Sequence, residues 1–102
     1  MALTVGVLAL VEAKPGKEAE VEAFLETGRS IVEQEPGTVV WYAFRVDGST
    51  FGIFDAFADD AGRDAHLNGR VAEALMARAD ELFSEPPAIE KVDVIASKLP
   101  GS

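Results

Sequence analysis

The sequence predicts a single domain of the α+β class, in which two helices pack against a four-stranded antiparallel sheet. With 102 residues, the chain is long enough for one hydrophobic core and too short for two ordinary domains. Two regions carry apolar residues at helical spacing, and four segments have the composition of β-strands. Their order along the chain is strand, helix, strand, strand, helix, strand.

The first strand is predicted over residues 3–13. Its apolar residues occur at both parities, with Val5 and Val7 on one side and Leu8 and Leu10 on the other. Because successive side chains of a strand point to opposite faces, this pattern indicates a strand that is buried on both faces.

The first helix is predicted to begin near Pro15, because the first turn of a helix tolerates proline. Its apolar residues fall on one side, which predicts a face that packs on a core: Val21, Phe24, Leu25, Gly28, Ile31 and Val32. At Gly28 the missing side chain permits close approach to a sheet, at a helix-propensity cost of about 1 kcal/mol. Glu35, Pro36 and Gly37 are predicted to end the helix.

Residues 38–46 and 50–58 are β-branched and aromatic runs separated by Asp47, Gly48 and Ser49. Three such turn residues between two strands are typical of a β-hairpin, so the two strands are predicted to pair antiparallel. Trp41 and Tyr42 are adjacent and so point to opposite faces of the sheet. Trp41 is assigned to the face that the helices leave free, and the reverse assignment stays open.

The second helical region is predicted in two parts. Asp59 or Asp60 caps a short helix that runs through His66 or Leu67, and Asn68 with Gly69 interrupts it. A second apolar stripe then runs over residues 71–83, and two prolines at 86 and 87 are predicted to stop this helix. The last strand is predicted over residues 89–97.

This order of elements matches one ferredoxin-like unit, predicted over residues 1–98, with residues 99–102 as a loose C-terminal tail. Both helices of such a unit cover the same face of the sheet, yet these strands are apolar on both faces. An uncovered apolar face favours association. The sequence therefore predicts a homodimer with the two sheets face to face.

Composition excludes several classes of partner and site. Asp and Glu outnumber Lys and Arg by 18 to 9, which argues against binding to nucleic acid. There is no cysteine, which fits a reducing compartment, and the cytoplasm is the expected location. The apolar first segment is too short to span a bilayer, so no membrane partner is expected. No glycine-rich phosphate-binding motif occurs, so no nucleotide cofactor is indicated.

Three stretches resemble the antibiotic biosynthesis monooxygenase family. Glu35-Pro36-Gly37-Thr38 leading to Trp41 is similar to the E-P-G turn before the family's second strand. The run F-G-I-F-D-A-F-A-D at residues 51–59 resembles its third strand, and Ala61 with Ala65-His66 resembles the A-x-x-x-A-H helix that follows. The resemblance implies a dimeric α/β barrel.

The resemblance also implies an activity. Characterised members include monooxygenases that need no cofactor and oxidise phenols or hydroquinones to quinones with O₂. Such a reaction needs a base, and His66 is the only histidine. The expected site has His66 as the base, with Trp41, Phe57 and Arg63 binding the aromatic substrate. No cofactor and no metal are expected.

Other interpretations remain open at this point. The same base and pocket would serve a small-metabolite isomerase or cyclase, and the domain could also be a non-catalytic dimeric module that binds a hydrophobic ligand. His66 could be a structural residue at a helix end. Asp55, inside a predicted strand, could orient His66 or pair with Arg45 across the hairpin. Asp59, Asp60 and Asp64 have the wrong spacing to form a metal site with His66.

Overall fold

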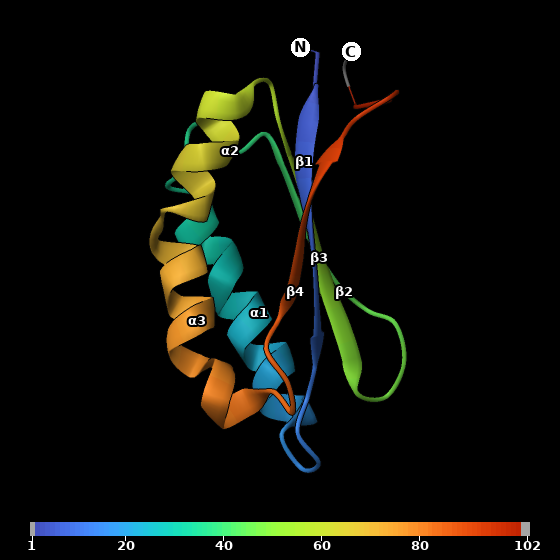
Figure 1. Cartoon of the computed structure of the whole chain (residues 1–102), viewed down its shortest axis with the longest axis vertical. Helices are drawn as coiled ribbons and strands as arrows, with labels where there is room; N and C mark the ends of the chain where they lie inside the picture. Colours follow the sequence, from blue (N-terminus) through green and yellow to red (C-terminus); the bar gives the residue numbers. More distant parts are fainter. Residues whose placement is uncertain (1, 101–102) are drawn as a thin grey trace.

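The computed structural model describes residues 2–100 and has two layers, with all helices on one side of a four-stranded sheet (Figure 1). Its elements in chain order are β1 (Val5–Glu12), α1 (Glu18–Val32), β2 (Val40–Arg45), β3 (Thr50–Phe57), α2 (Asp60–Leu67), α3 (Arg70–Leu82) and β4 (Ala88–Asp93). The strand order is β2-β3-β1-β4, and every neighbouring pair is antiparallel. The predicted α+β, ferredoxin-like fold is confirmed.

The strand register assigns each side chain to one of two faces. Val7 of β1 and Trp41 of β2 both lie opposite Asp55 of β3, so all three belong to the face that the helices cover. Most of the core side chains lie between this face and the helices; Val11, Val21, Leu25, Phe51, Ile53, Leu75 and Leu82 form its largest cluster together with Ala9, Ala13 and Phe83.

Trp41 therefore points toward the helices, and the predicted orientation toward the free face is wrong. A Cβ atom at Gly28 of α1 would lie 3.5 Å from the Trp41 ring, which is an ordinary contact distance, so the ring packs directly beneath this glycine. The neighbouring Tyr42 points to the opposite side of the sheet and is 59% exposed. The sequence could not distinguish these two orientations because both residues are aromatic.

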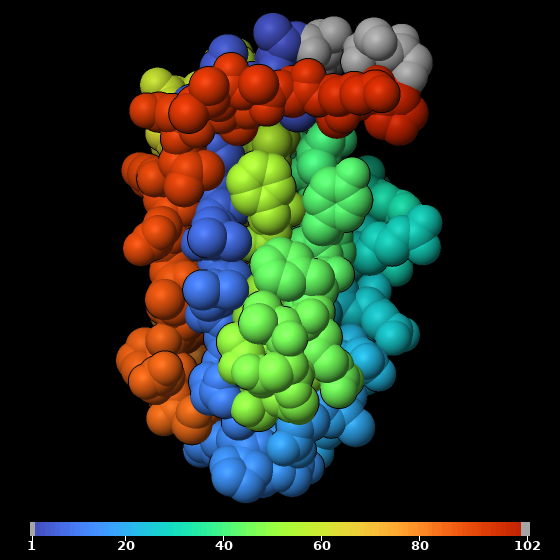
Figure 2. All heavy atoms as spheres, turned by 90° about the vertical axis from the view of Figure 1, so that its right-hand side faces the viewer, coloured from blue at the N-terminus to red at the C-terminus, as the bar shows by residue number. Residues whose placement is uncertain are grey.

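The second face of the sheet is open and carries aromatic and aliphatic side chains (Figure 2). Leu10 and Phe44 are 39% and 38% exposed there. Gly52 of β3 makes room for this layer, because a Cβ atom at Gly52 would lie within 2.4 Å of the Phe44 ring and 3.1 Å of Leu10. Strand β1 is thus buried on the helix side and partly exposed on the other.

The hairpin forms as predicted, with strands slightly shorter than expected. The Asp47 carboxylate accepts hydrogen bonds from the backbone N–H groups of Ser49 and Thr50, which closes the turn between β2 and β3. Asp59 caps α2 by accepting a hydrogen bond from the Gly62 N–H, and the break after α2 falls at Asn68 and Gly69, as the sequence indicates.

Three predicted boundaries are shifted. Helix α1 begins at Glu18, because Pro15 belongs to a turn in which Gly16 has a φ of 85°. Helix α3 ends at Leu82, before the prolines, because Phe83 leaves the helix to bridge to Ala13. Strand β4 ends at Asp93, which pairs with Val5, where β1 itself begins. The following segment crosses one end of the open face (Figure 2).

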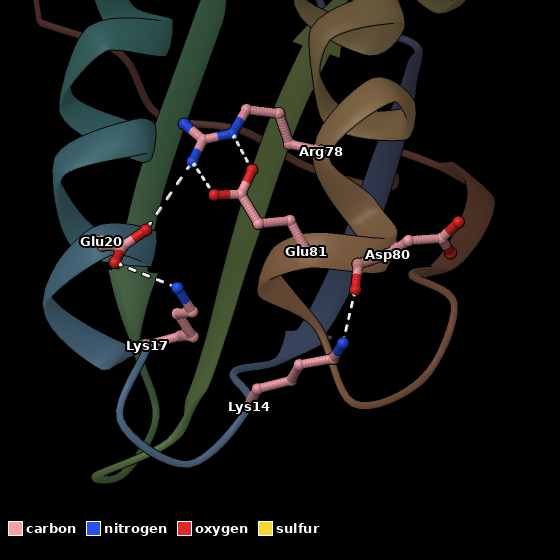
Figure 3. Close-up of polar contacts among 6 residues, drawn as sticks. All are labelled: Lys14, Lys17, Glu20, Arg78, Asp80 and Glu81. Carbon is pink, nitrogen blue, oxygen red and sulfur yellow. Dashed lines mark hydrogen bonds and ion pairs between the residues drawn. The ribbon is translucent and has the colours of Figure 1, made fainter.

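An exposed ion-pair network joins α1 to α3 on the outer surface (Figure 3). Arg78 donates two hydrogen bonds of 3.1 Å to Glu81, and its guanidinium lies 3.8 Å from Glu20. Lys17 pairs with Glu20, and Lys14 donates to the backbone carbonyl of Asp80. Within residues 2–100, no helix combines the length and apolar character needed to cross a membrane.

Candidate active site

Three ionisable side chains from separate elements meet beneath the sheet, and we call them the buried cluster: Glu35, Asp55 and His66. His66 lies in the last turn of α2, Asp55 projects from the helix-facing side of β3, and Glu35 lies in the turn that follows α1. His66 Nδ1 is 2.6 Å from Glu35 Oε1, and His66 Nε2 is 2.9 Å from Asp55 Oδ2. The histidine thus links α2 to both other elements.

An ionised carboxylate only accepts hydrogen bonds, so with Glu35 and Asp55 both ionised each ring nitrogen of His66 donates. This arrangement holds an imidazolium between two carboxylates, and the buried cluster then has a net charge of −1. His66 and Asp55 are 6% and 1% exposed. A cluster of this charge has room for one further proton, which would bring its net charge to zero.

The surroundings act on the pKa of His66 in opposing directions. Burial lowers the pKa because it disfavours the charged ring, but the hydrogen bonds and negative charges of Asp55 and Glu35 outweigh it. The net result is a pKa above the ordinary value for histidine. The contacts with Asp55 and Glu35 therefore favour the charged form of His66 over the neutral ring.

The buried cluster retains unused polar atoms. Among the described residues, Glu35 Oε2, Asp55 Oδ1 and the indole Nε1 of Trp41 are buried and have no hydrogen-bond partner. Buried polar atoms of this kind cost free energy, and native proteins keep few of them. Each of the two carboxylates thus has one oxygen on His66 and one oxygen without a partner.

A cavity of about 580 Å³ opens next to the buried cluster, between α1 and β2. Its apolar wall consists of Leu25, Val32, Val39, Trp41, Tyr42, Ala43, Phe44 and Phe51, and its charged residues are Glu22, Glu26, Arg29, Glu33 and Arg45. This volume lies in the range of small-molecule sites, and the apolar wall suits an aromatic ring.

Thr38 connects the cavity to the buried cluster. It lines the cavity, and its hydroxyl donates a 2.8 Å hydrogen bond to Glu35 Oε1, the same oxygen that contacts His66 Nδ1. Trp41 provides a second connection, because it lines the cavity and lies directly opposite Asp55 in the sheet. The histidine itself does not line the cavity.

The four residues predicted from sequence fall in different places. Trp41 lines the cavity. Phe57 is fully buried, and its ring centroid lies 5.4 Å from that of His66. Arg63 donates to the backbone carbonyls of Gly6 and Val92, which joins α2 to β1 and β4. The structure thus brings His66 and Phe57 together, whereas neither Phe57 nor Arg63 lines the cavity with Trp41.

The sequence leaves two partners open for Asp55, and in the structure Asp55 contacts His66. Arg45 instead pairs with Glu22 of α1 at 2.9 Å, so the predicted cross-strand ion pair is wrong. From the sequence alone, Glu35 is only part of a helix-ending turn, and nothing singles out Thr38. The E-P-G-T motif contains both residues and was the available signal.

The acidic residues near α2 have separate structural partners. Asp59 caps the helix, and Asp60 pairs with Arg63 at 3.1 Å. In the described part of the chain, no three His, Asp or Glu side chains have the geometry of a metal site.

Comparison with known proteins assigns the chain to a protein family. Residues 4–78 match the family model described as antibiotic biosynthesis monooxygenase. A crystal structure of NE2512, a protein of unknown function from Nitrosomonas europaea, is 50% identical, with a TM-score of 0.94 over 98% of this chain and 97% of that chain. The comparison with curated proteins gave no match.

Two more distant structures share the fold. PA3566 from Pseudomonas aeruginosa is 20% identical, with a TM-score of 0.78 over 94% of this chain and 98% of that one. Rv0793 from Mycobacterium tuberculosis is also 20% identical, with a TM-score of 0.77 over 97% and 99% of the two chains. At this identity the likeness concerns the fold alone.

Proposed function

Because the chain belongs to the antibiotic biosynthesis monooxygenase family, we propose that it is a cofactor-independent monooxygenase that oxidises a phenolic or hydroquinone substrate with O₂. The observation that carries this proposal is the contact from the cavity through Thr38 to Glu35 and His66. It supplies a proton acceptor at the wall of a cavity that suits a flat ring.

In the proposed first step, the substrate hydroxyl donates its proton to the Thr38 oxygen while Thr38 passes its own proton to Glu35. His66 holds Glu35 in place and keeps its positive charge, so the buried cluster goes from a net charge of −1 to zero. His66 is thus a positioning residue in this proposal, and Glu35 accepts the proton through Thr38.

The resulting phenolate is electron-rich and reduces O₂ by one electron. The two radicals then combine, so that a C–O bond forms at a ring carbon that bears hydrogen, ortho or para to the oxygen, and gives a peroxide anion. This anion takes back the proton from Glu35 along the same path. Loss of water from the hydroperoxide breaks the O–O bond and leaves a quinone, so that one substrate and one O₂ give one quinone and one H₂O.

Trp41 supports the proposal because its ring lines the cavity and offers a surface on which a flat ring can stack. Phe57 and Arg63 have supporting roles in it: Phe57 packs against His66, and Arg63 fixes α2, which carries His66.

Filling the cavity tests where the reaction takes place. Ala43 lines the cavity, so Ala43→Trp should abolish oxygen uptake with anthrone and quinol substrates. The matched control is Ala77→Trp, at an exposed position of α3 outside the cavity, which should keep the wild-type rate. Equal uptake by both variants would remove the cavity from the mechanism. Product formation without oxygen uptake would favour an isomerase that uses the same proton path.

We also propose that the open face of the sheet pairs with the same face of a second copy. Leu10, Tyr42 and Phe44 are large apolar side chains left exposed there, and Ile95 beyond β4 is 99% exposed. Sedimentation should show a dimer at micromolar concentration, Leu10→Glu should dissociate it, and Met76→Glu on the helix side should not. A wild-type monomer would contradict the pairing.

A further inference from the structure

The charged residues around the cavity fall into two neutral pairs and one remaining acid. Arg45 Nη2 lies 2.9 Å from Glu22 Oε1, and Arg29 Nη2 lies 3.2 Å from Glu33 Oε1. Within residues 2–100, Glu26 forms no ion pair, although it lines the same cavity. The five side chains together therefore carry one net negative charge.

Neither arginine is available to an anionic ligand without loss of an existing contact. Arg45 also lies over the Phe51 ring, with its Cζ 4.9 Å from the ring centroid, so it is held from two sides. A ligand carboxylate that recruited Arg45 would leave Glu22 without its partner, and would also approach Glu26. Both effects oppose the binding of an anion.

The net charge of the whole molecule also opposes the binding of an anion. The chain has a formal net charge of −9, so its long-range field repels anions and attracts cations. The buried cluster beneath the cavity adds a further net negative charge close to Trp41.

From these charges we propose that the cavity selects aromatic ligands without an anionic group, and that Glu26 is the residue that rejects ring-bound carboxylates. The substrate of the proposed reaction is then an uncharged or amine-bearing phenol, and its carboxylated analogue is excluded. The inference rests on the cavity of the proposed function, but it concerns binding and does not depend on turnover.

The test uses three ligands with the same ring system: 1-naphthol, 1-naphthylmethylamine and 1-naphthoate. Trp41 is the only tryptophan, so its single indole N–H resonance in a ¹⁵N-labelled sample reports occupation of the cavity. At low salt, 1-naphthoate should bind about tenfold more weakly than 1-naphthol, the factor for two unit charges roughly 6 Å apart at an effective dielectric constant of about 40. The amine should bind at least as tightly as the naphthol.

Two variants of Glu26 and one control variant test whether Glu26 causes the weaker binding of naphthoate. Glu26→Gln should remove most of the difference between naphthol and naphthoate, and Glu26→Lys should reverse it. Glu85→Gln changes the net charge equally at an exposed loop position outside the cavity, and should leave the difference unchanged.

Naphthoate binding equal to or tighter than naphthol binding in the wild type would overturn the inference, as would failure of all three ligands to shift the Trp41 resonance. Retention of the full discrimination in Glu26→Gln would overturn the assignment to Glu26. Oxygen uptake is a separate readout: selective binding without uptake by any phenol would overturn the monooxygenase proposal and leave this one standing.

Discussion

Two clusters in this domain place one cation between two carboxylates but have opposite surroundings. In the surface cluster, Arg78 lies between Glu20 and Glu81, and the side chains are 39%, 49% and 52% exposed (Figure 3). In the buried cluster, His66 lies between Glu35 and Asp55, and the side chains are 7%, 18% and 2% exposed. In each, one cation contacts two carboxylates, and in the surface cluster Lys17 also pairs with Glu20.

The difference in burial decides what each cluster does. Water and salt screen the surface cluster, so its ion pairs contribute little to stability and have no site to act on. The buried cluster is shielded from water, lies beside the cavity and keeps polar atoms without partners. The same arrangement of charges is thus a surface contact in one place and the centre of the candidate site in the other.

Removal of the cation from each cluster should give the largest contrast. His66→Ala leaves Glu35 and Asp55 as uncompensated buried carboxylates, so the free energy of unfolding should fall by about 3 kcal/mol or more. Arg78→Ala leaves two exposed carboxylates in contact with water and should cause a much smaller loss. Urea unfolding at neutral pH measures both. Equal losses would show that the buried cluster is solvated in solution.

The pH dependence of stability should differ in sign between the clusters. The pKa of His66 is raised in the folded state, so its stabilising contribution is fully present below about pH 6.5, the unfolded pKa. It is lost as the pH rises through the higher folded pKa. The pKa of Glu81 is lowered by hydrogen bonds from Arg78, so that contribution is present above the unfolded pKa of Glu81 and is lost as the pH falls.

Urea midpoints measured from acid to alkaline pH, for the wild type and for His66→Gln and Arg78→Gln, test these signs. The difference between wild type and His66→Gln should shrink toward alkaline pH, and the difference for Arg78→Gln should shrink toward acid pH. A difference for His66→Gln that grew with pH would contradict the imidazolium between two carboxylates.

High salt should give the smallest of the three contrasts in stability between the two clusters. At about 1 M salt the Debye length is about 3 Å, so exposed charges are strongly screened. The effect of Arg78→Ala on the urea midpoint should nearly vanish there, whereas the effect of His66→Ala should be kept. A loss of both effects would place His66 in contact with solvent.

The sequence predicted the fold well because its patterns are periodic. The helical stripe from Val21 to Val32 and the turn at Asp47–Ser49 define a helix and a hairpin through local rules, and the structure has both. The boundaries that shifted depend on tertiary contacts: Phe83 leaves α3 to bridge to Ala13, and β4 ends where its partner strand β1 begins.

The site was predicted less completely, for a physical reason. A single histidine is easy to find in a sequence, but its partners come from residues 11 positions before it in β3 and 31 positions before it in a turn. Asp55 was considered as a partner, whereas Glu35 and Thr38 were seen only as part of a turn motif. Which face Trp41 occupies depends on strand register, and the adjacent Tyr42 gave the alternative equal support.

The most direct test of the account is the rate of oxygen uptake by Thr38→Val compared with Thr38→Ser, with a quinol that the wild type oxidises. Valine keeps the shape of threonine without the hydroxyl that joins the cavity to Glu35, and serine restores that hydroxyl. We expect Thr38→Val to lose at least about tenfold in rate, since a positioned proton-transfer group contributes a factor of about 10² or more, and Thr38→Ser to recover most of it. Equal rates in both variants and the wild type would contradict the proton path from the cavity to the buried cluster.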